Sequence, residues 1–171
     1  MSFIIALDAA GNVVGQGVND GQFLPPCPVG GEIKIVDELP SAYLLSVAKE
    51  AQLSAVYASC GRAIVAGFIS DALGSPHLYP SKAEDQTNLI GAAIASSQTD
   101  LPVDWVVPFS CADESGTWDK RLHSPSQIQK VLSDGVTKRV AYSAKLASLC
   151  AQINAIENPS KISDIREIIW S

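Results

Sequence analysis

The side chains that could do chemistry are few and widely spaced in this 171-residue chain. Its two histidines, His77 and His123, lie in no HExxH or HxH spacing that would hold a metal ion. No P-loop, GxGxxG or GxSxG sequence occurs, so neither a phosphate-binding loop nor a nucleophile elbow is predicted. We therefore expect no enzyme, no cofactor and no metal, although folding could still bring a cysteine beside a histidine.

The cysteines, acidic pairs and tryptophans all have structural explanations. The four cysteines form no CxxC pair, and we expect them to be free thiols in a reducing cytoplasm. The acidic pair at 113–114 is typical of a solvated turn, and the pair at 84–85 suits the positive end of a helix dipole. Trp105, Trp118 and Trp170 could stack on a sugar, but such residues more often anchor a small core or an interface.

Composition narrows the class of protein. The net charge is −6 and the sequence pI about 4.8, which argues against a nucleic-acid binder or a partner for anionic membranes. With 47% hydrophobic and 18% charged residues, the chain can bury a core. No segment reaches the roughly 20 uninterrupted apolar residues of a membrane span, and the first residues lack the basic region of a signal peptide.

The first forty residues predict β-structure. Residues 3–7 form an apolar run, residues 8–12 are typical of a turn, and residues 32–36 alternate polar with apolar side chains. We therefore predict a small antiparallel β meander over 1–40. Such a meander cannot cover both of its own faces, so it must pack on a helix or on another chain.

The rest of the chain predicts helices joined by short hairpins. Helices are expected over 41–67, from a Ser81-x-x-Glu84 capping box to about 97, over 125–155, and after Asn158-Pro159. Segments 68–70 and 77–79 could pair as a small hairpin, and a strand from Trp105, continuing toward 112, is expected to return at 117–118. The predicted fold class is α+β, with a β-rich region over 1–40 and a mainly helical module over 41–171.

The long helix over 125–155 carries an apolar seam. Alternating steps of three and four residues place these side chains on one face: Ile128, Leu132, Gly135, Arg139, Tyr142, Leu146, Leu149, Ile153 and Ile156. Gly135 and Arg139 interrupt the seam in its middle. Two interpretations stay open, a contact between copies of the chain and a helix packed on its own domain.

Residues 67–91 contain a recognisable pattern. The sequence runs GFISDALGSPHLYPSKAEDQTNLIG, and the positions that carry the pattern are Gly67-Phe68, Ser70, Ala72-Leu73-Gly74, His77, Tyr79, Ser81, Asp85-Gln86, Asn88-Leu89 and Gly91. The pattern resembles a module of tailed-bacteriophage tail proteins, a family of tail-fibre assembly and fibre-associated proteins. Many members are known only as a domain of unknown function. The resemblance covers about residues 50–170.

The resemblance implies a non-enzymatic role in the virion tail, since the family offers no catalytic residue to carry over. Residues expected to form the structural motif or to touch a partner are Phe68, Leu73, Gly74, His77, Tyr79, Ser81, Asp85, Gln86, Asn88, Trp105, Leu146, Leu149 and Ile153. Among them, His77, Tyr79 and Asp85-Gln86 are expected to form one polar network that joins the small hairpin to the following helix.

Three functional alternatives follow. The first is a structural component at the junction of tail fibre and baseplate, with the fibre or other tail proteins and further copies of itself as partners. The second is a chaperone that binds the trimeric fibre in the host cytoplasm and is absent from the mature virion. The third is a host-directed enzyme or inhibitor, which would need a cleft with perturbed titratable groups. The alanine-rich helix and low charge favour the first.

Overall fold

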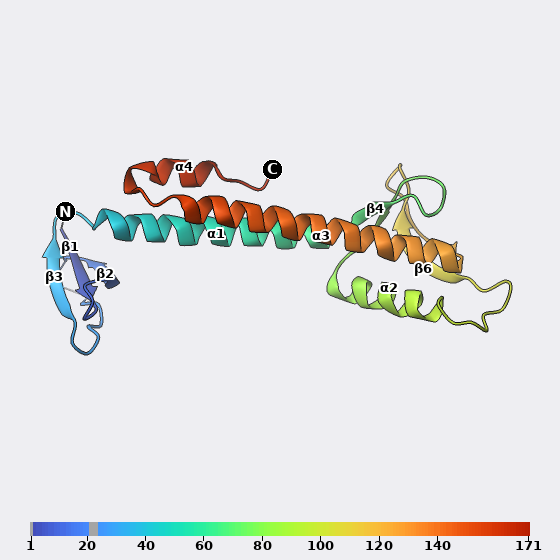
Figure 1. Cartoon of the computed structure of the whole chain (residues 1–171), viewed down its shortest axis with the longest axis horizontal. Helices are drawn as coiled ribbons and strands as arrows, with labels where there is room; N and C mark the ends of the chain where they lie inside the picture. The colour runs from blue at the N-terminus through green and yellow to red at the C-terminus, as the bar shows by residue number, and fades with distance from the viewer. Residues whose placement is uncertain (1, 21–23) are drawn as a thin grey trace. The chain divides into compact units, whose positions relative to one another are not determined.

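The computed structural model describes residues 2–20 and 24–171. Over this part the chain contains a three-stranded and a four-stranded antiparallel sheet, four α-helices and one short 3₁₀ helix, which confirms the α+β class. The chain forms two compact units, one made of residues 1–54 and 151–169 and the other of 55–150 and 170–171. The long helices α1 (Ser41–Val65) and α3 (Pro125–Ala155) each contribute to both units (Figure 1).

The first unit contains the small sheet of β1 (Phe3–Leu7), β2 (Val13–Val18) and β3 (Glu32–Val36). Asp8 makes the β1–β2 turn, since its carboxylate accepts the backbone N–H groups of Ala10 and Asn12 at 2.9 and 2.8 Å. The strand order is β2-β1-β3, whereas a simple meander would place β3 beside β2. The apolar β1 takes the central position, and the long proline- and glycine-rich connection lets β3 reach its other edge.

The same unit contains the start of α1, the end of α3 and the C-terminal elements η1 (Pro159–Lys161) and α4 (Ile162–Glu167). Asn158 caps η1 as expected, by accepting the Ser160 N–H at 3.0 Å. Within these C-terminal elements, Ile165 is fully buried, whereas Ile169 is exposed.

The second unit is built on the sheet of β4 (Phe68–Ser70), β5 (His77–Tyr79), β6 (Val107–Ala112) and β7 (Trp118–His123), in that order. The predicted hairpin is confirmed, with Phe68 opposite Tyr79. Gly67 precedes it with φ +101°, where a Cβ would collide with the carbonyl oxygen of Tyr79. The return strand β7 continues beyond its predicted end at residue 118, to His123. The sequence did not predict this extension because the side chains that the strand turns toward the core, Arg121 and His123, are polar.

Two helices cover one face of this sheet. Helix α2 (Ala83–Ala95) begins later than expected: the Lys82 N–H donates to the Asp85 carboxylate at 2.9 Å, so Asp85 and not Glu84 completes the cap. Helix α3 begins as expected, with the Ser124 N–H donating to Gln127 Oε1 at 2.8 Å. The core between sheet and helices consists of Phe68, Tyr79, Leu89, Phe109, Cys111, Ile128 and Val131.

Candidate functional site

The Phe68 ring of β4 lies directly against Gly135 of α3. A Cβ at position 135 would come within 2.8 Å of the Phe68 ring, and the phenylalanine itself is buried. The ring also stacks on Tyr79, with centroids 5.7 Å apart. Glycine at 135 therefore lets the aromatic motif residue pack against the helix backbone, and this explains the first interruption of the seam in α3.

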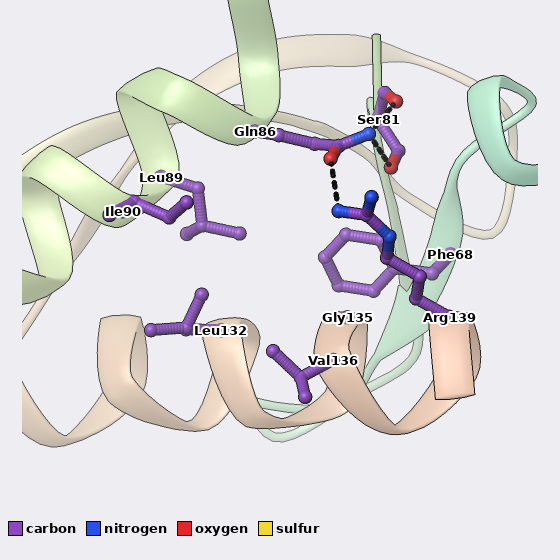
Figure 2. A pocket seen from close by; sticks show the side chains of 9 residues that line it. All are labelled: Phe68, Ser81, Gln86, Leu89, Ile90, Leu132, Gly135, Val136 and Arg139. Carbon is purple, nitrogen blue, oxygen red and sulfur yellow. Dashed lines mark hydrogen bonds between the residues drawn. The ribbon is translucent and has the colours of Figure 1, made fainter. Parts of the chain in front are cut away.

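Arg139, the second interruption, is joined to the motif through Gln86. The Gln86 side chain donates to the Ser81 carbonyl oxygen at 2.8 Å and accepts from the Arg139 guanidinium at 3.0 Å (Figure 2). Both ends of the amide are thus used, which fixes the Gln86 side chain between α2 and α3. Gly135 and Arg139 break the apolar seam where two motif residues, Phe68 and Gln86, meet α3.

Tyr79 and His123 form a buried polar pair, and both are 0% exposed. The His123 Nδ1 lies 2.8 Å from the Arg121 carbonyl oxygen, which can only accept, so Nδ1 carries the proton. Its Nε2 is then the acceptor for the Tyr79 hydroxyl, 2.8 Å away. The expected network through His77, Tyr79 and Asp85-Gln86 is wrong: His77 donates locally to the Ser75 carbonyl, Asp85 caps α2, and the Tyr79 hydroxyl pairs with a histidine 44 residues away.

Folding brings a cysteine beside Tyr79, the tyrosine that pairs with His123. The Cys111 thiol lies next to the Tyr79 hydroxyl and is 0% exposed. Burial raises the pKa of Cys111 and, together with the neighbouring Cys111, raises the pKa of Tyr79, so both groups stay protonated. A thiol that is neutral and closed to substrate packs as a small apolar side chain.

His123 should make the stability of the protein sensitive to mild acid. Burial lowers the pKa of His123 below its usual value of 6.5, so the folded state binds this proton less readily than the unfolded state. We expect the free energy of unfolding to decrease from about pH 7 to about pH 5, as the unfolded state gains this proton. Urea unfolding across this range measures the effect.

The variant for this test is His123→Gln, compared with the unsubstituted protein. The His123→Gln protein should be less stable at neutral pH but should lose the slope. The carboxyl groups of Asp8, Asp71 and Asp113, whose pKa is lowered, release their protons in a more acidic range and do not overlap this window. A slope in His123→Gln equal to that of the unsubstituted protein would contradict the role given to His123.

A small pocket opens beside the Gln86–Arg139 pair. Its volume is about 70 Å³, and side chains from β4, α2 and α3 line it, with Leu132 and the half-exposed Ile90 and Val136 among them (Figure 2). One turn further along each helix, Ile94 and Val140 are also exposed. The lining is mainly apolar, and Arg139 supplies the charge at its edge.

Comparison with known proteins identifies the family. The family described as a domain of unknown function (DUF4376) matches residues 47–168. The chain belongs to the DUF4376 family. No curated protein and no solved structure matches the chain. The matched residues nearly coincide with the range 50–170 over which the resemblance was found. The family's description names no phage tail protein and assigns no activity.

The DUF4376 segment contains every residue predicted for the motif, and most of them are structural. Gly74 makes a turn with φ +90°, and Leu73 and Trp105 pack at the edge of the core. Leu149 and Ile153 are buried within the single chain, and Leu146 is partly buried. Asn88 stays exposed, in a separate cleft between α2 and β6.

Four residues that contact the motif residues were not predicted as site residues from the sequence: Cys111, His123, Gly135 and Arg139. The two breaks in the apolar seam of α3 were the available signal for Gly135 and Arg139. The described residues contain no cluster of three metal-ligating side chains, and no described helix is long and apolar enough to cross a membrane.

Proposed function

We propose that this DUF4376 protein is a non-enzymatic phage tail protein that stands at the junction of tail fibre and baseplate and positions the fibre. Its partners are the fibre or neighbouring tail proteins, together with further copies of itself. It lies in the host cytoplasm during assembly and in the virion tail afterwards. The proposal rests on the resemblance of residues 67–91 to tail-fibre proteins.

The observation that carries an architectural role is the use made of the motif residues. Phe68 against Gly135 and Gln86 against Arg139 fix the hairpin, α2 and α3 relative to one another within the second unit. Such contacts support a rigid corner that presents helix surfaces. Half-exposed aliphatic residues on α2 and α3 support a surface that a protein partner covers.

An enzyme is the less supported class. The groups with shifted pKa that lie together, Tyr79, Cys111 and His123, are all closed to solvent. A general base or nucleophile must reach its substrate. Because the three groups with a shifted pKa are buried in the core, their arrangement supports a structural role.

The alternative within the same context is an assembly chaperone that binds the trimeric fibre and then leaves. The same exposed surface of α2 and α3 would serve it. Quantitative mass spectrometry separates the two roles, applied to salt-washed particles of the phage that encodes the chain and to the infected-cell lysate. An abundant host protein measured in both samples corrects for carry-over.

We expect a fixed copy number in the particles, in a ratio of small integers to the fibre protein. Abundance in the lysate with absence from the particles would establish the chaperone instead. If the chain were absent from particles and did not co-purify with the unassembled fibre, both tail roles would be wrong.

A further inference from the structure

The connection between α2 and β6 ends in a turn with an apolar tip. The Trp105 N–H donates to the Pro102 carbonyl oxygen at 3.0 Å, so Val103 and Asp104 are the two central residues of a β-turn. Trp105 packs against the core of the second unit and anchors the turn. Val103 is fully exposed at the tip, and Asp104 forms no ion pair within the described residues.

The pocket between α2 and α3 has the complementary chemistry. A cavity of about 150 Å³ holds a benzene ring, so a pocket of about 70 Å³ suits an aliphatic side chain and is too small for an aromatic one. Arg139 at its edge donates to a neutral amide oxygen and, over the described chain, has no acidic partner. Lys138 beside it lies over the Tyr142 ring, again without a carboxylate.

We propose that the pocket of one copy receives the Val103–Asp104 turn of a second copy. The Val103 side chain enters the apolar pocket between Ile90 and Val136, and the Asp104 carboxylate pairs with Arg139. Each side thereby neutralises a charge that has no ion-pair partner among the described residues, and a fully exposed valine is buried.

A second copy fits better than an unrelated partner because this chain itself carries both halves of the contact. An aliphatic residue adjoins a carboxylate at the turn, and an apolar pocket adjoins a guanidinium. A backbone hydrogen bond closes the turn and Trp105 anchors it, so it should lose less conformational entropy on binding than an unstructured segment. The inference rests on the part of the proposed function in which several copies lie together.

Sedimentation velocity of the purified full-length chain over a concentration series tests the contact without any phage component. We expect a concentration-dependent oligomer. Arg139→Glu and Asp104→Arg should each weaken association at least tenfold, because each opposes like charges across the contact. Val103→Ser should weaken it as well, whereas the matched control Val29→Ser changes an equally exposed valine elsewhere and should not.

Mixing the Arg139→Glu and Asp104→Arg proteins gives the decisive result. Opposite charges then face each other wherever the two variants meet, so the mixture should associate more tightly than either variant alone. Both positions are exposed, but Arg139→Glu also removes the hydrogen bond to Gln86. Circular dichroism and the urea midpoint of each variant must therefore match those of the unsubstituted chain.

Monomers at every concentration, or a mixture that stays monomeric, would overturn the inference. A monomeric chain that binds fibre protein, with binding lost in Val136→Phe, would assign the pocket to the fibre and also overturn it. Sedimentation tests only the contact between copies, whereas mass spectrometry of the particles tests the proposed role in the tail. Failure of one proposal can therefore be distinguished from failure of the other.

Discussion

Replacing Tyr79 by alanine is expected to lower the free energy of unfolding by about 3–5 kcal/mol. The ring is completely buried, stacks on Phe68 with centroids 5.7 Å apart and lies tilted against Phe109 at 6.4 Å, so its removal leaves a cavity in the core. The hydroxyl is the partner of His123 Nε2, which would lose its donor. Urea unfolding at neutral pH measures the loss.

Two further variants separate packing from hydrogen bonding at this position. Tyr79→Phe keeps the ring and removes only the hydroxyl, and should cost about 1–3 kcal/mol because His123 is left unsatisfied in the core. Tyr57→Ala changes an exposed tyrosine on α1 and should alter stability by no more than about 0.5 kcal/mol. Equal losses of stability in Tyr79→Ala and Tyr57→Ala would contradict the packing of Tyr79 in the core of the second unit.

The elements predicted well from the sequence are those fixed by neighbouring residues. The long helix α3 begins at its Ser124–Gln127 cap, and η1 begins directly after its cap residue Asn158, because each cap joins residues within three positions of each other. The hairpin of β4 and β5 was predictable for the same reason, since its turn lies between its two strands.

Contacts between distant residues were not predictable from one sequence. His123 pairs with Tyr79 across 44 positions, and Arg139 with Gln86 across 53. The sequence showed polar residues at 121 and 123, which obscured β7, because a strand with its polar face toward the core lacks the usual alternation. A local network around Tyr79 was the wrong inference because its partner lies on another strand of the sheet.

Substituting Gly135 is expected to have the second large effect on the free energy of unfolding. Helix propensity alone would predict that Gly135→Ala stabilises the protein, whereas we expect it to be destabilising. In a solvated helix, Gly→Ala gains about 1 kcal/mol. At Gly135 the added Cβ would lie 2.8 Å from Phe68 Cζ, and overpacking of a buried ring costs about 1–3 kcal/mol. We therefore expect Gly135→Ala to be destabilising in net terms and Gly135→Leu to cost about 3 kcal/mol or more.

Gly61 is the matched control because it lies within α1, where an added Cβ would meet no atom within 4 Å beyond the helix's own backbone and its chain neighbours. Gly61→Ala should stabilise the protein by about 0.5–1 kcal/mol. The cause of the Gly135 effect is tested by Phe68→Leu, which shortens the opposing side chain. In the double variant with Gly135→Ala, the loss should be smaller than the sum of the single losses by at least about 1 kcal/mol.

Additive losses would mean that Phe68 and Gly135 do not meet, and a Gly135→Ala protein as stable as Gly61→Ala would mean the same. Either result would contradict the contact between Phe68 and Gly135 that holds β4 against α3 beside the pocket. Coupled losses would instead show that a glycine in a long helix is retained for an aromatic residue 67 positions away. Gly135, an interruption of the apolar seam, would then serve the packing of α3 on the β4–β5 hairpin of the same chain. Contact between copies would be made by the exposed residues around the pocket instead.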